Sequence, residues 1–190
     1  MGVIEMTDDP TLETERLWLR PLTLADAPVI QTLVNDRRIA ETTLNIPYPY
    51  PENGAADWIR RIRERRAQGY ADYTFGIVRK LDMALIGIIS IHVWRDQRAE
   101  IGYWVGVNYW GQGYMTEAAR RVIRFGFEDL GLHRIIARYF TRNPASERVM
   151  QKIGMTFEGI MRQHLIKWGE FVDVGCYSIL RSEYETQREV

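Results

Sequence analysis

Two glycines lie close together between a predicted strand and a predicted helix. They occupy positions 111 and 113 of the stretch Val107-Asn-Tyr-Trp-Gly-Gln-Gly-Tyr-Met-Thr-Glu-Ala118. Glycine allows a positive φ and a close approach of the backbone to a ligand. The first N–H groups of a helix bind phosphate, helped by the helix dipole. The stretch therefore predicts a pyrophosphate cradle, while a plain strand-to-helix turn is the alternative use of the same glycines.

Two other phosphate-binding loops do not fit this stretch. The chain lacks the Gly-x-x-x-x-Gly-Lys-Ser/Thr pattern of a Walker loop. A dinucleotide fingerprint would need a third glycine where Thr116 stands, and an acidic residue at the end of the next strand, which residues 133–140 lack. The antiparallel hairpins predicted upstream also contradict a doubly wound sheet.

Hydrophobic periodicity and breaking residues predict the elements that must position the cradle. We predict strands at residues 16–20, 73–79, 85–94, 98–107, 134–140, 156–166 and 172–180. We predict helices from the Thr23–Asp26 capping box to about residue 35, through residues 55–62, at 115–130 and from Asn143 to residue 154. Short turns join the middle strands into an antiparallel meander, and strand 98–107, helix and strand 134–140 form a parallel crossover.

These elements predict one domain across residues 1–190, of mixed α/β class. Its core is a single central sheet, twisted and mostly antiparallel, of about seven strands with about four flanking helices. Residues 1–13 are acidic and polar, and we predict a loose leader there. The Pro- and Tyr-rich residues 45–53 predict an ordered loop, because proline at that density prevents helix and central strand.

The composition excludes several classes of protein. With 25 Lys+Arg and 25 Asp+Glu, the chain has no basic surplus, so a nucleic-acid partner is not expected. No apolar run approaches the roughly 20 residues that span a membrane. The single cysteine, Cys176, fits a reducing cytoplasm and a place in the core. His92 and His133 lack spaced partners, so no metal site is predicted.

The cradle and several other motifs resemble one known family. The pattern Gln/Arg-x-x-Gly-x-Gly/Ala maps onto Trp110, Gly113 and Met115, with departures at its first and last positions. Further matching pieces are Glu15-Arg-Leu-Trp-Leu-Arg-Pro21, Pro47-x-Pro49-Tyr50, Ala99-Glu-Ile-Gly-Tyr103 and Asn143-x-x-Ser146. Together they resemble the GNAT superfamily of N-acetyltransferases, and the form Trp-Gly-x-Gly-Tyr-x-Thr-Glu-Ala resembles its RimJ/RimL branch. The resemblance covers roughly residues 14–184.

The resemblance implies a co-substrate, acetyl-CoA, and a place for it. In the GNAT fold the fourth and fifth strands, here residues 98–107 and 134–140, splay apart around the pantetheine arm. Backbone groups of Tyr103, Trp104 and Val105 would pair with that arm, and Asn143 would bind it near the thioester. The pyrophosphate would be held by the amides of Gly111, Gln112, Gly113, Tyr114, Met115 and Thr116.

The resemblance also implies acid and base candidates. Glu100 lies where several GNAT enzymes place a glutamate base, although a surface carboxylate paired across strands is almost as good an interpretation. Many relatives use a tyrosine acid seven residues after the Asn143 position, but Met150 stands there and cannot donate a proton. Ser146 is the substitute, with a polar first-turn residue as the alternative. His164, on the strand that faces the substrate in relatives, is a second base candidate.

The acceptor of the acetyl group is the least constrained prediction. The loop at residues 46–51 is stiff and aromatic, and Tyr48 and Tyr50 offer flat apolar area with a polar tip. We expect such a loop to bind a peptide or protein N-terminal α-amine. A small amine (a polyamine, amino acid or antibiotic) is the alternative, and a non-catalytic acyl-CoA-binding module is the alternative from another class. A homodimer is compatible with the sequence.

Overall fold

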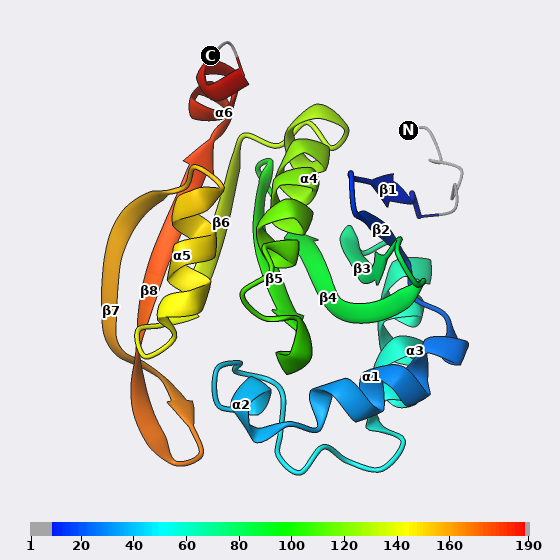
Figure 1. The fold of residues 1–190 in the computed structure, drawn as a ribbon. Coiled ribbons are helices and arrows are strands. Elements are labelled where there is room, and N and C mark those ends of the chain that lie inside the picture. The colour runs from blue at the N-terminus through cyan, green and yellow to red at the C-terminus, as the bar shows by residue number, and fades with distance from the viewer. Residues whose placement is uncertain (1–8, 189–190) are drawn as a thin grey trace.

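The computed structural model describes residues 9–188 of the chain. In this part of the chain, one mixed sheet of eight strands is flanked by six α-helices (Figure 1). The strands are β1 (Leu12–Glu13), β2 (Leu17–Pro21), β3 (Asp72–Arg79), β4 (Ala84–Val93), β5 (Arg98–Val105), β6 (Arg134–Phe140), β7 (Thr156–Lys167) and β8 (Glu170–Leu180). The helices are α1 (Ala27–Val34), α2 (Arg37–Ala40), α3 (Gly54–Ala67), α4 (Tyr114–Glu128), α5 (Pro144–Lys152) and α6 (Arg181–Arg188).

The strand order is β1-β2-β3-β4-β5-β6-β8-β7. Every neighbouring pair is antiparallel except β5 and β6, which are joined by α4 and run parallel. This confirms the predicted mixed α/β fold, with its meander and its single parallel crossover. Such a crossover needs a helix long enough to carry the chain back over the sheet, and the 15-residue α4 supplies it.

Three elements differ from the sequence-based prediction. Residues 12 and 13 form β1, which pairs with β2 and buries Leu12, so the predicted loose leader is wrong for these two residues. Residues 1–8 of that leader lie outside the described part of the chain. The four-residue α2 and the polar α6 were not predicted, because neither presents an apolar stripe at helical spacing.

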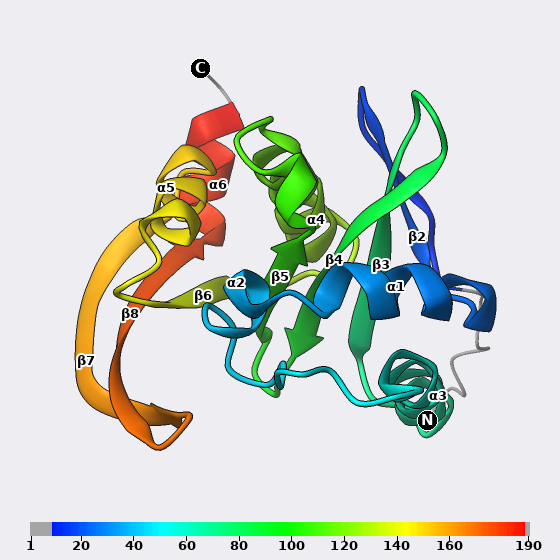
Figure 2. The same ribbon diagram turned by 60° about the horizontal axis from the view of Figure 1, so that its bottom comes forward.

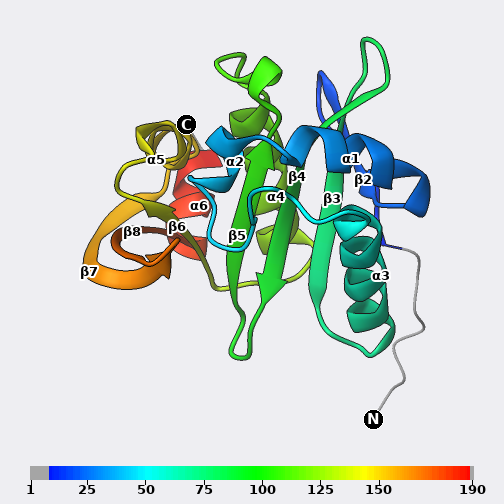
Figure 3. The same ribbon diagram turned by 90° about the horizontal axis from the view of Figure 1, so that it is seen from below.

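Helices cover both faces of the sheet, α4 on one and α1 with α3 on the other (Figure 3). The larger core lies under α4, whose Ala118, Ala119 and Val122 are fully buried against apolar residues of the central strands. The second core lies under α1 and α3 and is centred on Ile30, Ile59 and neighbouring strand residues. The helices follow from this burial, because each places one apolar stripe on the sheet.

Strands β5 and β6 separate part-way along their length. They share only four register pairs, from Arg98–Arg134 to Ile101–Ala137. Beyond this point β5 stays with β4 as far as Val105, and β6 stays with β8 as far as Phe140, so that β6 runs toward β7 and β8 in Figure 3. The predicted splay of these two strands is therefore confirmed.

Glycine at position 87 allows β5 to lie close against β4. A Cβ there would lie 2.5 Å from the carbonyl oxygen of Trp104 and 2.8 Å from Cα of Val105. Only a residue without a side chain allows the two backbones to come this close. The end of β5 is thereby held against β4, away from β6.

Candidate active site

A cavity of about 940 Å³ lies at the gap between β5 and β6. Its walls come from the separated ends of these strands, the N-terminal ends of α4 and α5, and the segment of residues 41–46. Figure 2 shows α2 and the chain after it passing across the region where β5 and β6 diverge. The strand splay therefore brings segments distant in sequence to one cavity.

The predicted cradle has the conformation that its glycines were expected to allow. Gly111 has φ +73° and Gly113, the N-cap of α4, has φ +79°. The first intrahelical bond runs from the Glu117 N–H to the Gly113 carbonyl, 3.1 Å. The N–H groups of the three residues before Glu117 therefore have no partner within the helix. They lie at the positive end of a 15-residue helix beside the cavity, as a phosphate site requires.

Trp110 ties the cradle to the end of β5. Its indole Nε1 donates to the carbonyl oxygen of Val105 over 2.8 Å. The general family pattern has Gln or Arg at this position, so the tryptophan keeps a donor where the pattern departs. The bond also occupies the Val105 carbonyl, one of the backbone groups expected to pair with the pantetheine arm.

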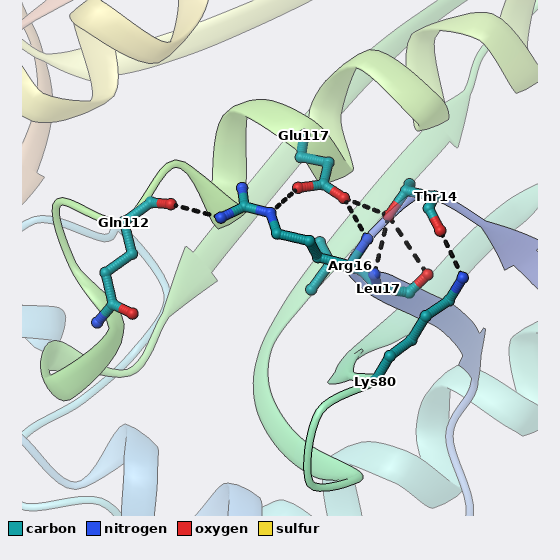
Figure 4. Close-up of polar contacts among 6 residues, drawn as sticks. All are labelled: Thr14, Arg16, Leu17, Lys80, Gln112 and Glu117. Carbon is teal, nitrogen blue, oxygen red and sulfur yellow. Dashed lines mark hydrogen bonds and ion pairs between the residues drawn. The ribbon is translucent and has the colours of Figure 1, made fainter.

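A half-buried carboxylate, that of Glu117, joins the cradle to the start of the sheet (Figure 4). One oxygen of Glu117 accepts from the Thr14 hydroxyl at 2.6 Å and from the backbone N–H of Arg16 at 2.8 Å, and the other accepts from Arg16 Nε at 2.6 Å. Arg16 also donates to the Gln112 carbonyl at 3.1 Å, while Lys80 donates to the Thr14 carbonyl at 2.6 Å. The cradle is thus held in shape before any ligand enters.

The ionisation of Glu117 belongs to this arrangement. Burial alone would raise its pKa, but the hydrogen bonds from Thr14 and Arg16 outweigh burial and hold the pKa of Glu117 below its ordinary value. The Glu117 side chain is 19% exposed and that of Arg16 is 44% exposed. Solvent therefore screens the Arg16 guanidinium, and the ion pair with Glu117 adds only modestly to the stability of the fold.

Asn143 and Ser146 begin α5 at the far side of the gap, and both line the cavity. The Asn143 side-chain oxygen accepts from the Ser146 N–H over 3.2 Å, so Asn143 is the N-cap that the sequence predicted. With its oxygen engaged, the carboxamide offers its NH₂ group to a ligand. Met150, the position of the usual tyrosine acid, is buried in the core.

The hydroxyl of Tyr103 is a site group that sequence reasoning missed. It lies 3.1 Å from the Ser146 hydroxyl and donates to the Ser146 carbonyl over 3.3 Å. Burial raises the pKa of Tyr103 to about 12, although the Ser146 hydrogen bond opposes the shift. The phenol is therefore protonated at neutral pH. The two residues are 43 positions apart, and nothing in the local sequence pattern indicated that they meet.

Glu100 also lies on the cavity wall, but its carboxylate is engaged. Arg138 on β6 donates from Nε and from Nη2 to the two Glu100 oxygens, each over 2.8 Å. Such a bidentate pair is a strong, oriented interaction. A proton on Glu100 would remove the negative charge that this ion pair with Arg138 depends on.

The other expected substrate residues lie apart from the cavity wall. Tyr48 is 46% exposed, Tyr50 packs against the core under α1 and α3, and His164 is exposed on β7. These three side chains and Gln112 are outside the lining, whereas the other expected cofactor-binding residues line it.

A buried lysine fixes the segment that does line the cavity. Lys167, 4% exposed, donates its ammonium to the carbonyls of Leu44 at 3.2 Å and Ile46 at 2.8 Å. Burial lowers the pKa of Lys167, and nearby Arg142 lowers it further. The β7–β8 hairpin therefore holds the wall formed by residues 44–46, a link between segments that lie more than 120 positions apart in the sequence.

Residues 16–156 match the family model described as an acetyltransferase (GNAT) domain. The chain belongs to the GNAT acetyltransferase family. It is an acetyl-CoA-dependent N-acetyltransferase. The resemblance was based on sequence motifs, and the splayed strands that it implied are present in the structure.

The sequences of related proteins align with nearly the whole of this chain. The "Uncharacterized N-acetyltransferase p20" of Bacillus licheniformis is 34% identical over 176 residues, 92% of this chain and 98% of the relative. The "Putative ribosomal N-acetyltransferase YdaF" of Bacillus subtilis (strain 168) is 32% identical over 185 residues, 92% of this chain and 96% of the relative.

Solved structures share the fold. A GNAT-family acetyltransferase from Bacillus anthracis superimposes with a TM-score of 0.82 at 26% identity, covering 91% of this chain and 99% of its own. The RimL enzyme for ribosomal protein L7/L12, in complex with coenzyme A, gives 0.81 at 21% identity, covering 90% and 98%. A spermidine N-acetyltransferase from Vibrio cholerae gives 0.77 at 23%, covering 90% and 99%. Since the last two act on different acceptors by name, the fold alone does not select one.

Two further observations concern the described residues 9–188. None of their helices is both long and apolar enough to cross a membrane. Their His, Cys, Asp and Glu side chains form no group of three placed to hold a metal ion.

Substitution of Gly113 by valine tests the cradle. A β-branched residue at φ +79° distorts the turn that aims the helix amides, so we expect acetyl-CoA binding to weaken at least tenfold, about 1.4 kcal/mol. Gly131→Val is the matched control, because Gly131 has φ +66° and lies beyond the other end of α4. A Cβ would meet nothing within 4 Å at Gly131 and only Arg16 Nη2, at an ordinary contact distance of 3.5 Å, at Gly113. Titration calorimetry that finds equal affinities for both variants would remove the cradle from the site.

Substitution of Glu117 by glutamine tests the carboxylate that holds the cradle. The pKa of Glu117 is lowered on folding, so its contribution is present above its ordinary value of 4.5 and is lost as the pH falls through the folded value. We expect the variant to be less stable by about 1 kcal/mol at pH 7 and the difference to shrink below pH 4.5. Urea unfolding at both pH values measures this, with the exposed Glu185→Gln as control. A pH-independent difference would contradict the assignment.

Proposed function

We propose that this GNAT enzyme transfers the acetyl group of acetyl-CoA to the α-amine of a peptide or protein N-terminus. Acetyl-CoA supplies an activated acyl carbon as a thioester. The neutral amine attacks that carbon directly, a C–N bond forms, the C–S bond breaks, and the sulfur leaves with the electron pair. The roles of the individual residues below are part of this proposal.

The charge of the cavity wall carries the choice of acceptor. The only acidic residues among the described lining are Glu41 and Glu100, and Glu100 is neutralised by Arg138. The lining also holds the cations Arg38, Arg148 and Lys152. A polyamine carries several positive charges and would need several available carboxylates, whereas a peptide end carries a single amine. The wall therefore favours the peptide.

The ionisation of the acceptor supports the same choice. An α-amine with a pKa near 8 is roughly 10% neutral at pH 7, which costs about 1.4 kcal/mol. A lysine side chain with a pKa near 10.4 would cost about 4.6 kcal/mol by the same arithmetic. A peptide α-amine therefore needs only modest help to become the nucleophile.

The co-substrate has a place for each of its parts. The amides at the start of α4, from Gly111 to Thr116, would hold the pyrophosphate, and the open edge of β5 at Tyr103 and Trp104 would pair with the pantetheine arm. The NH₂ group of Asn143 would bind the arm near the thioester. The left-handed glycines beside a cavity of about 940 Å³ support this fit.

The leaving thiolate would take its proton from the Ser146 hydroxyl. Tyr103 lies 3.1 Å behind that hydroxyl and can replace its proton. The family position for a tyrosine acid is Met150 here, so Ser146 and Tyr103 together would perform that role from different elements.

Steady-state acetylation of N-terminal peptides and of spermidine, side by side, tests the acceptor. We expect a higher kcat/KM for the peptides. We also propose that Tyr48→Ala and Tyr50→Ala raise the acceptor KM and leave the KM for acetyl-CoA unchanged, because the stiff loop that carries them lies next to the cavity segment of residues 41–46. Faster turnover of spermidine would overturn the peptide assignment and favour the small-amine alternative. Acetyl-CoA binding without turnover of any amine would favour the binding-module alternative.

Ser146→Ala and Tyr103→Phe test the proton donor. Loss of a general acid should lower kcat by roughly 10²-fold, with the larger effect for Ser146→Ala if its hydroxyl faces the sulfur. Replacing coenzyme A by a donor with a more acidic thiol should restore most of the rate, because such a leaving group needs no proton. A thiol-independent loss would assign both residues to structure instead.

A further inference from the structure

A serine, a histidine and an aspartate form a hydrogen-bonded line on neighbouring strands. Ser90 Oγ lies 3.0 Å from Nε2 of His92, and Nδ1 of His92 lies 3.3 Å from Oδ1 of Asp72. Asp72 stands opposite His92 in the β3–β4 register. With a proton on Nδ1 shared with Asp72, Nε2 keeps its lone pair and accepts from the Ser90 hydroxyl. This order of groups, in which a carboxylate orients an imidazole next to a hydroxyl, is how proteins position a histidine base.

The outer end of the line is fixed and its middle is open to solvent. Arg65 on α3 donates to the Asp72 carboxylate from Nη2 at 2.7 Å and from Nε at 3.1 Å. The Asp72 side chain is 17% exposed, whereas that of His92 is 46% exposed. The imidazole is therefore held in one orientation and can still exchange a proton with water.

The inner end of the line lies against β5, the strand that borders the gap. Ser90 pairs with Gly102 of β5, and the Gly102 carbonyl oxygen, 3.3 Å from Ser90 Oγ, is the alternative acceptor for the hydroxyl proton. Gly102 and His92 both line the cavity. Ser90 is 9% exposed, and a Cβ at position 102 would lie 3.6 Å from its Oγ, so Gly102 adds no side chain between Ser90 and the cavity.

Gly102 is the residue next to Tyr103, and side chains of consecutive strand residues point to opposite faces of a sheet. Ser146 and Tyr103 therefore lie on one face of β5, while Ser90 and His92 lie against the other. A thioester held in the gap would have its sulfur near the first pair and would meet the amine on the side of the second pair.

Resting on the proposed function, we propose that His92 is the general base of the transfer and takes the acceptor's proton through the hydroxyl of Ser90. The amine proton passes to Ser90 Oγ as the Ser90 proton passes to His92 Nε2, and the C–N bond forms as the C–S bond breaks. The thiolate is protonated on the other face of β5, and the imidazolium returns its proton to water. The sum is acetyl-CoA plus amine giving amide plus free thiol.

The charges around His92 suit this role. Asp72 on β3 faces Nδ1 and stabilises the imidazolium, and Arg65 on α3 balances Asp72. Glu100 stands opposite His92 on β5, but Arg138 on β6 neutralises it. His92 is therefore the group available to take up the transferred proton, because the Glu100 carboxylate is held in its ion pair with Arg138.

His92→Gln tests the base, measured as kcat at saturating amine from pH 5 to pH 8 with the best acceptor found. Only a neutral imidazole can accept a proton, so we expect the ratio of wild-type to variant kcat to be smallest at pH 5. The ratio should rise to roughly 10² at the alkaline end. Because both enzymes use the same amine, the titration of the amine affects both kcat values equally and does not change their ratio. Titration calorimetry should give an unchanged Kd for acetyl-CoA, which shows that the variant is folded.

Three further variants separate a base from a structural residue. His133→Gln, on an exposed histidine before β6, should keep the wild-type kcat at every pH. Ser90→Ala should reproduce the pH-dependent ratio of His92→Gln. Asp72→Asn should lower kcat about tenfold with an unchanged acceptor KM, as expected for a positioning residue.

Two results would overturn the assignment of His92. One is a His92→Gln enzyme with wild-type kcat across the pH range. The other is a pH-dependent ratio that appears in Glu100→Gln and is absent from His92→Gln. A wild-type enzyme that turns over no amine at all would refute the proposed function, and with it the relay, while wild-type turnover with an unaffected His92→Gln would refute the relay alone.

Discussion

The whole site depends on the separation of two parallel strands after four residue pairs. Parallel strands inside a sheet normally satisfy each other's backbone groups along their full length. Here β5 continues with β4 and β6 continues with β8, so a stretch of β5 keeps an unpaired edge inside the molecule. An extended ligand with amide groups of its own can complete that edge, and Gly87 allows β5 to lie tightly against β4 on the side away from the gap.

The helix ends that surround this gap are held in place by hydrogen bonds within the protein, before a ligand binds. The start of α4 is held by Glu117 through Thr14 and Arg16, and the start of α5 is capped by Asn143. Each of these contacts joins a loop to a regular element, so little backbone has to be ordered when a ligand binds. Because β5 alternates, one strand also separates a hydroxyl pair on one face from the Ser90–His92–Asp72 line on the other, which gives the two proton transfers different environments.

The regular elements could be predicted from the sequence because their signals are local. Strand β6 and the Asn143 cap follow from short patterns of apolar residues and breakers. Helix α6 could not be predicted from periodicity, since its eight residues are polar and it is held by contacts such as the stacking of Tyr184 on Phe127, 4.8 Å apart. In the site, the glycines were predictable because φ > 0 demands them. The contacts of Tyr103 with Ser146, Arg138 with Glu100 and Lys167 with the 44–46 segment depend on residues that meet only in the folded chain.

We propose that coenzyme A lies along the free edge of β5 with its pyrophosphate on the first turn of α4. Amide hydrogen exchange, resolved by residue with and without saturating coenzyme A, tests it most directly. We expect slower exchange at residues 111–116 and 103–105 and no change at the far end of α4. Saturating coenzyme A that leaves both segments unchanged and protects another part of the chain would contradict it.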